Sequence, residues 1–135
     1  MQSFEFLIRK RPVSLQTKSR RNLQAWKQYV FNEANRSWIV GTPPIASGGL
    51  RCSIVYLSAE MPADIDNIIK PIQDALVGLV FEDDFLITDV DSHRRPLNQP
   101  FDLRGMPALL SQGYFLGAEC VYVKISPAKN LREYL

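Results

Sequence analysis

The fold is decided by residues 50–91, which read LRCSIVYLSAEMPADIDNIIKPIQDALVGLVFEDDFLITDVD. Residues 50–57 are rich in β-forming side chains and predict a strand. Residues 66–77 carry apolar side chains at helical spacing, and Gly78 follows as a helix-ending residue. Residues 85–91 alternate between apolar and polar side chains, which is typical of a second strand. The segment therefore predicts the order strand, helix, strand.

Elements on either side of this segment complete the expected fold. We expect strands over Phe4–Ile8, Trp38–Val40 and Ala118–Ile125, and a helix from Arg20 to about Asn35. Ser19 is placed to cap that helix. The stretch Pro96–Gly117 is irregular, with a short helix expected over Met106–Gln112. Because strands and helices do not alternate strictly, the sequence predicts an α+β fold, a mixed β-sheet packed with two main helices.

Length and composition place the chain among ordinary globular proteins. It has 135 residues, of which 46% are hydrophobic and 22% charged, so we expect one compact domain over residues 1–135. No stretch approaches the roughly 18 apolar residues of a membrane span. Basic residues follow the apolar start of the chain, whereas a secretory signal has them first. Cys52 and Cys120 alone make no disulfide framework, so we expect a cytoplasmic protein with reduced thiols and no membrane partner.

Charge is unevenly distributed along the chain. Residues 1–51 hold nine Lys or Arg and two acids, a net charge of +7. Residues 52–91 hold one Lys and nine acids, a net charge of −8, and residues 92–135 hold six Lys or Arg and three acids, a net charge of +3. Basic flanks suit a polyanion, and an acidic centre suits a metal ion that neutralises it. Chance segregation of charge in a small protein is the alternative.

The acidic centre contains a candidate metal site. Asp64 and Asp66 are two residues apart, which in an extended segment puts both side chains on one face. After the helix and Gly78 the chain can double back, so Asp83 or Asp84 can meet the first pair. Three converging carboxylates repel one another, and a hard divalent cation such as Mg²⁺ relieves that repulsion. Bound to a phosphate ester, Mg²⁺ supports hydrolysis.

Each of these acids also has a purely structural interpretation. Asp64 or Asp66 can cap the helix. Lys70 is four residues from both Asp66 and Asp74, which predicts ordinary helix ion pairs. Glu82 and the acids after it can form a solvated turn.

The combination of motifs is more specific than its parts, and it resembles the RusA family of Holliday-junction resolvases. The resemblance is carried by Asp64-Ile65-Asp66-Asn67-Ile68-Ile69-Lys70, then Asp74-Ala75-Leu76, Gly78 and Asp83-Asp84, and it continues weakly to Arg94-Arg95. It is strong over residues 61–95. Pro71, directly after the motif lysine, and the segment 96–117 depart from the family pattern.

The resemblance implies a reaction and a set of site residues. It implies a homodimeric, Mg²⁺-dependent endonuclease, with Mn²⁺ as a substitute ion, that hydrolyses phosphodiesters in branched, four-way DNA. The catalytic and metal-binding carboxylates are expected at Asp64, Asp66 and Asp84, and the motif lysine at Lys70. Asp83 is either a further ligand or a supporting residue. From their chemistry, Asn67 is expected to support a ligating carboxylate and Asp74 to hold Lys70.

Basic side chains are expected to contact the DNA backbone, which positions a duplex without reading its bases. The candidates are Arg9, Lys10, Arg11, Lys18, Arg20, Arg21, Arg94 and Arg95. His93 is interpreted as a phosphate contact or a surface residue. Two other functions stay open from the residues alone: a catalytically inactive module that binds branched DNA, and a metal phosphodiesterase acting on other nucleic-acid structures.

Overall fold

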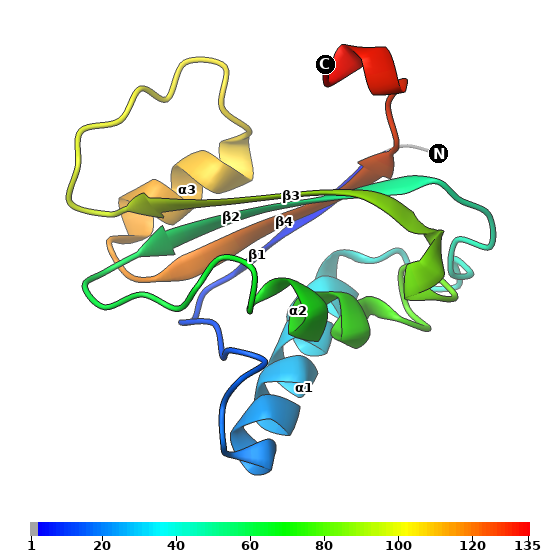
Figure 1. Cartoon of the computed structure of the whole chain (residues 1–135), viewed down its shortest axis with the longest axis horizontal. Coiled ribbons are helices and arrows are strands. Elements are labelled where there is room, and N and C mark those ends of the chain that lie inside the picture. The colour runs from blue at the N-terminus through cyan, green and yellow to red at the C-terminus, as the bar shows by residue number, and fades with distance from the viewer. Residues whose placement is uncertain (1–2) are drawn as a thin grey trace.

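A four-stranded mixed sheet forms the centre of the protein (Figure 1). The computed structural model describes residues 3–135. The strands are β1 (Phe4–Ile8), β2 (Leu50–Ser58), β3 (Ile87–Pro96) and β4 (Cys120–Pro127), and their order in the sheet is β1-β4-β2-β3. Strand β4 runs antiparallel to both β1 and β2, whereas β2 and β3 are parallel. The expected α+β fold with a mixed sheet is confirmed.

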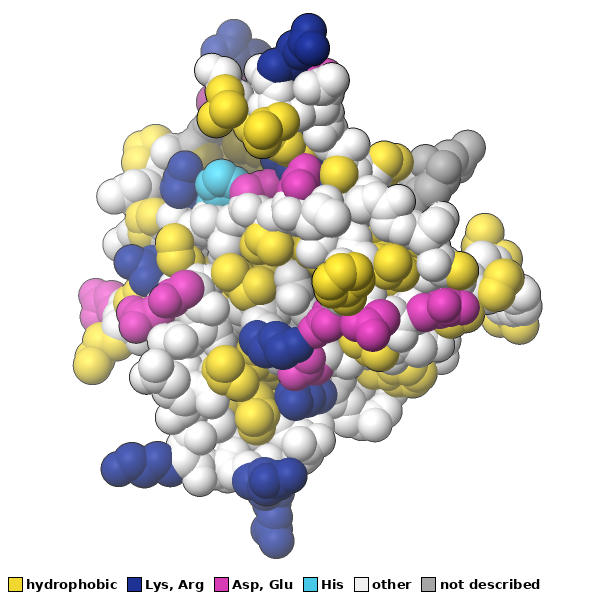
Figure 2. All heavy atoms as spheres, turned by 45° about the vertical axis from the view of Figure 1, so that its right-hand side comes forward, with side chains coloured by type: hydrophobic (Ala, Val, Ile, Leu, Met, Phe, Trp, Pro, Cys, Tyr) yellow, Lys and Arg dark blue, Asp and Glu magenta, His cyan; other side chains and the backbone are white. Residues whose placement is uncertain are grey.

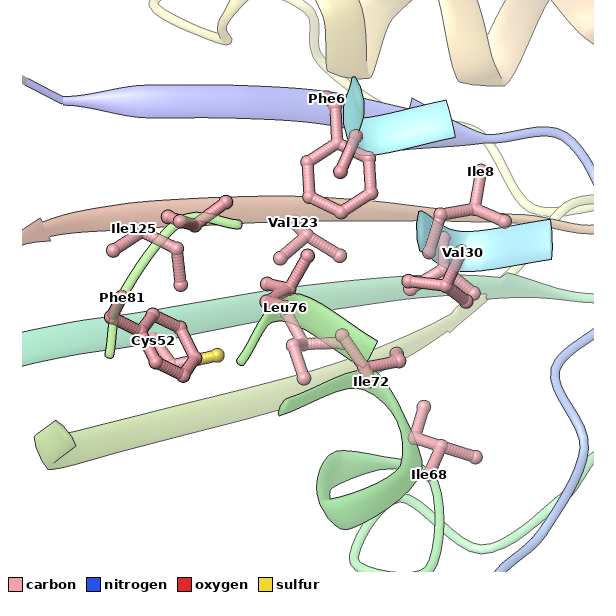
Figure 3. Packing of buried hydrophobic residues seen from close by; sticks show 14 of the residues in the cluster. Phe6, Ile8, Val30, Cys52, Ile68, Ile72, Leu76, Phe81, Val123 and Ile125 are labelled. Atoms are coloured by element: carbon pink, nitrogen blue, oxygen red, sulfur yellow. The ribbon is translucent and has the colours of Figure 1, made fainter. Parts of the chain in front are cut away.

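Helices cover both faces of this sheet. Helices α1 (Arg20–Ser37) and α2 (Ile69–Leu76) lie on one face, and α3 (Ala108–Leu116) lies on the other (Figure 1). Phe6, Cys52 and Val123 belong to the core under α1 and α2, where Figure 3 shows them beside α2 side chains. Their strand neighbours Leu7 and Tyr122 pack in a smaller core under α3. Burial on both faces explains why these strands carry apolar side chains at consecutive positions, as in Phe6-Leu7-Ile8.

The predicted capping of α1 is confirmed. The Ser19 side chain accepts a hydrogen bond from the backbone N–H of Asn22 at 3.1 Å. One stripe of the helix, Trp26, Val30 and Ala34, is buried against the sheet. Its i, i+4 spacing follows from 3.6 residues per turn. The helix lies against α2 and β1, so it packs directly on the helix of the acidic segment.

Helix α2 is shorter than the sequence predicts. It begins at Ile69 instead of Asp66 because residues 65–68 form a turn, in which the N–H of Asn67 bonds to the carbonyl of Asp64 at 3.2 Å. Pro71 then falls in the first helical turn, where its missing N–H removes no helical hydrogen bond. The helix ends as expected, with Gly78 in the left-handed region at φ +86°.

One predicted strand is absent and other predicted boundaries are shifted; β3, for example, ends at Pro96 instead of Asp91 and α3 at Leu116 instead of Gln112. Residues 38–40 form no strand: Trp38 ends α1, its N–H bonding to the carbonyl of Ala34 at 3.0 Å, and its ring packs on Phe4. Strand β3 starts at Ile87 because Asp84–Leu86 form a 3-10 turn, η1. Helix α3 starts at Ala108, two residues after the expected Met106, because the residue before a proline disfavours helical backbone and Pro107 stands there.

The remaining features of the fold are a turn near the C-terminus and two cysteine thiols. A second 3-10 turn, η2 (Leu131–Glu133), follows β4. Cys52 and Cys120 are buried free thiols in the two separate cores, as expected of small core residues. Within residues 3–135, no helix combines the length and the apolar character that crossing a bilayer requires.

Candidate active site

Asp64 and Asp66 lie in the loop that connects β2 to α2, and both are exposed. The loop is tied to the rest of the protein through the carbonyls of alternate residues. Ala63 O accepts from Arg94 Nη1 at 3.2 Å, and Ile65 O accepts from Ser92 Oγ at 3.1 Å, so both bonds come from β3. The carbonyls at 63 and 65 thus face protein donors, which fixes the backbone on either side of Asp64.

Lys70 lies between two carboxylates. Its Nζ contacts Asp84 Oδ2 and is 2.9 Å from Asp74 Oδ1, one helical turn along α2. The carboxylate of Asp84, and after it that of Asp74, raises the pKa of Lys70. The hydrogen bond from Lys70 in turn lowers the pKa of Asp84. The contact joins residues 14 apart, so the chain does double back to the first turn of α2.

The neighbouring polar residues have clear structural partners. Asp83 Oδ1 accepts from the N–H of Phe85 at 2.9 Å and so caps η1. Asn67 Nδ2 points to Asp64 Oδ2 at 3.5 Å, the long limit of a hydrogen bond. Asp74 also faces Lys27 of α1, at 3.4 Å, so its carboxylate lies between two lysines, Lys27 and Lys70.

The acids have the right chemistry for a hard divalent cation but are not gathered around a point. Carboxylate oxygens are the ligands that such cations prefer, and Asp64, Asp66 and Asp84 offer three of them. Within residues 3–135, however, no three His, Cys, Asp or Glu side chains lie close enough together to hold an ion. The Lys70 ammonium group stands beside Asp84 as its positive partner.

The predicted DNA-binding residues are all exposed but are not in one patch. Figure 2 shows acidic and basic side chains in contact on one face, with further Lys and Arg side chains projecting from its lower end. Arg11 and Arg94 contact the loop before α2, through Met61 O and Ala63 O. Arg9 instead lines a small hollow beside Leu109 of α3. Lys10 lies 4.9 Å from the ring centroid of Tyr29.

A further cluster lies on the opposite face of the sheet from the Asp64 loop. Side chains alternate along a strand, so His93 faces away from Ser92 and Arg94, which contact the loop. His93 Nε2 is 3.1 Å from Asp91 Oδ1, and Asp91 Oδ2 also contacts Arg51 Nε at 2.6 Å. This position separates His93 from the candidate carboxylates.

One residue near the site carries no recognisable sequence signal. Glu119, directly before β4, accepts from Tyr56 Oη and from the N–H of Ala59, each at 2.9 Å. It also faces Arg11 at 3.3 Å. An isolated acid before an apolar strand looks like any surface residue, and only the tertiary structure brings it to the β2–α2 loop.

Comparison with known proteins identifies the family. A family profile described as Endodeoxyribonuclease RusA matches residues 8–100, which include the whole acidic segment. No curated protein matches the sequence significantly. The match spans more than half of the chain and contains the loop, α2 and the return to Asp84. The chain therefore belongs to the RusA family and is a metal-dependent Holliday-junction endonuclease.

Proposed function

We propose that Asp64, Asp66 and Asp84 carry the hydrolysis of phosphodiester bonds in four-way DNA, with Mg²⁺ as the ion. The observation that carries this proposal is the contact between Lys70 and Asp84. It brings the acid after α2 next to the first turn of the helix, and Asp66 lies just before that turn. The ion polarises the phosphoryl group and lowers the pKa of a bound water when it occupies such a site.

The side chains of the three acids supply the oxygens for the ion. Asp64 and Asp66 are exposed at the surface, so their carboxylates are free to reorient toward Asp84. Mg²⁺ fits an all-oxygen donor set and usually keeps several waters, and Mn²⁺ accepts the same ligands. Asn67 steadies Asp64 from within the turn, and Asp83 fixes the backbone around Asp84 by capping η1.

Lys70 supplies positive charge next to the acids. Its ammonium group is held on α2 by Asp74, so it does not depend on Asp84 alone for its position. With an ion held by Asp84, the Lys70 ammonium group would be available to stabilise negative charge on the scissile phosphate. In this proposal Asp74 and Lys70 act as a pair, with Asp74 as the positioning residue.

The DNA arms are held by the exposed basic residues around the start of α1 and at the end of β3. Phosphates bind favourably at a helix N-terminus, where unpaired N–H groups coincide with Arg20 and Arg21. A homodimer with two-fold symmetry presents two such sites and matches the approximate two-fold symmetry of a four-way junction.

The test is the substitution Asp66→Asn, which removes one negative charge and keeps the size of the side chain. We expect cleavage of a labelled four-way junction in Mg²⁺ to fall by about 100-fold or more, because residue 66 would offer the ion a neutral amide oxygen in place of a charged carboxylate. Junction binding in Ca²⁺ is expected to stay at the wild-type level. Asp102→Asn is the matched control, since Asp102 is an exposed acid paired with Arg104 in another loop. Wild-type cleavage by Asp66→Asn contradicts the proposal.

A further inference from the structure

The β2–α2 loop is held at its beginning by a residue that lies far away in the sequence. Glu119 is in the connection between α3 and β4, outside the matched residues 8–100. Its side chain is only 12% exposed. One oxygen accepts from the hydroxyl of Tyr56, near the end of β2, and from the N–H of Ala59, the first residue of the loop, both at 2.9 Å.

Arg11 extends this network along the loop. Its Nη1 is 3.3 Å from Glu119 Oε2, and its Nη2 donates to Met61 O at 2.7 Å. Met61 has a left-handed backbone, with φ of 55°. A residue with a Cβ keeps that conformation only where its surroundings hold it. Glu119 therefore holds the loop backbone at two points, directly at Ala59 and through Arg11 at Met61.

The loop is thus fixed at four alternate residues before Asp66. Glu119 and Arg11 bind the backbone at 59 and 61, and Arg94 and Ser92 bind it at 63 and 65. Asp64 and Asp66 are the exposed side chains at the end of this tethered stretch. Without its first two anchors, the stretch that carries both carboxylates is held only by the two contacts from β3.

We propose that Glu119 is a positioning residue of the active site, which sets the place of Asp64 and Asp66 through Ala59 and Arg11. The proposal rests on the proposed function of those two acids. The negative charge matters because the carboxylate accepts from three donors at once, one of them a guanidinium group. A glutamine at this position keeps the size and one acceptor oxygen but turns an N–H₂ group toward a donor.

The first test is Glu119→Gln, with Glu33→Gln as the matched control. Glu33 is an acid of similar exposure, 11%, that pairs with Arg36 on α1. We expect kcat on a four-way junction to fall by about 10–100-fold in Glu119→Gln, as for partners that orient metal ligands, with KM little changed. Mn²⁺ affinity without DNA, measured by electron paramagnetic resonance, is expected to weaken as well. Glu33→Gln is expected to match the wild type in both.

A second variant separates positioning from simple charge effects. Arg11→Met breaks the contacts with Glu119 and Met61 but leaves Glu119 bonded to Tyr56 and Ala59. Losing a positive charge alone strengthens cation binding, whereas losing the loop anchor weakens it. We expect weaker Mn²⁺ binding, the same direction as in Glu119→Gln despite the opposite change of charge. This measurement also decides the matter if Glu119→Gln does not fold.

The results distinguish this inference from the proposed function. If Asp66→Asn is inactive while Arg11→Met binds Mn²⁺ as tightly as the wild type or more tightly, the positioning role of the Glu119–Arg11 pair is overturned and the carboxylate site stands. A folded Glu119→Gln with wild-type kcat and Mn²⁺ affinity has the same meaning. If Asp66→Asn is active, the proposed function itself fails.

Discussion

Lys70 contacts the carboxylates of Asp74 and Asp84, and these two contacts differ in kind. Asp74 lies one turn further along the same helix, so its contact is local and fixes the side chain. Asp84 comes from the segment after the helix, so its contact depends on the tertiary fold. The ammonium group of Lys70 therefore lies where a metal cation would neutralise Asp84. Asp74 keeps Lys70 near the site whether or not such a cation is bound.

Replacement of Lys70 by glutamine tests this arrangement. We expect kcat on a four-way junction to fall by about 10²–10³-fold, the usual cost of removing a group that stabilises transition-state charge. Mn²⁺ affinity without DNA is expected to be equal to or tighter than that of the wild type, because the competing ammonium group is gone. Electron paramagnetic resonance gives the affinity, and single-turnover cleavage gives the rate.

Lys27→Gln provides the comparison for this variant. Lys27 contacts Asp74 from α1 at 3.4 Å, so its loss changes the surroundings of Asp74 and leaves Lys70 beside Asp84. We expect it to cleave like the wild type. Weaker Mn²⁺ binding in Lys70→Gln would show that the lysine organises the acids instead of competing with a cation.

At the scale of elements, local signals in the sequence predicted the elements well. The cap at Ser19 and the apolar stripe of α1 are local features, and both were sufficient to place that helix. Boundaries set by tertiary contacts were not predictable in the same way. Trp38 is an aromatic residue of the kind that strands favour, but its ring packs edge-on against the ring of Phe4, with the two ring centroids 5.0 Å apart. Strand β3 extends to Pro96 because it pairs with all of β2.

The candidate site also combines residues that a local sequence pattern indicates with residues that only the tertiary structure brings together. Asp64, Asp66 and Lys70 are candidates because their spacing is a local pattern in the sequence. The return of Asp84 to α2, which the structure shows, followed from the helix and its glycine. The supports of the loop were not predictable. Arg11 and Glu119 are 108 residues apart in sequence, and nothing in either neighbourhood indicates that they meet. The sequence also suggested DNA contact for Arg11 and Arg94, without indicating that both bind loop carbonyls.

At the scale of the whole molecule, the sheet separates two cores, and each core contains a buried thiol. Burial raises the pKa of Cys52 to about 12 and that of Cys120 to about 11. Burial, together with the hydrogen bond to Glu119, raises the pKa of Tyr56 to about 12. These groups are neutral in the folded protein under conditions in which they ionise in the unfolded chain.

The folded protein is therefore expected to lose stability in alkali. The thiol contribution is fully present below the unfolded thiol pKa of 9.0 and is lost as the pH rises toward the folded values. Each thiol that ionises only on unfolding lowers the free energy of unfolding by about 1.4 kcal/mol per pH unit in this window. Urea unfolding under reducing conditions at pH 8 to 11 measures the slope. Cys120→Ala should reduce it, and a free energy independent of pH would contradict the burial of both thiols.

In the proposed site, Asp64, Asp66 and Asp84 share a divalent cation, although Lys70 is the partner of Asp84 in the structure. The most direct measurement is the anomalous difference density of crystals grown in Mn²⁺. We expect one or two peaks with oxygens of all three carboxylates at about 2.0–2.6 Å, and Lys70 displaced from Asp84. Crystals saturated with Mn²⁺ in which the three carboxylates stay apart, with no peak between them and Lys70 still on Asp84, would contradict it.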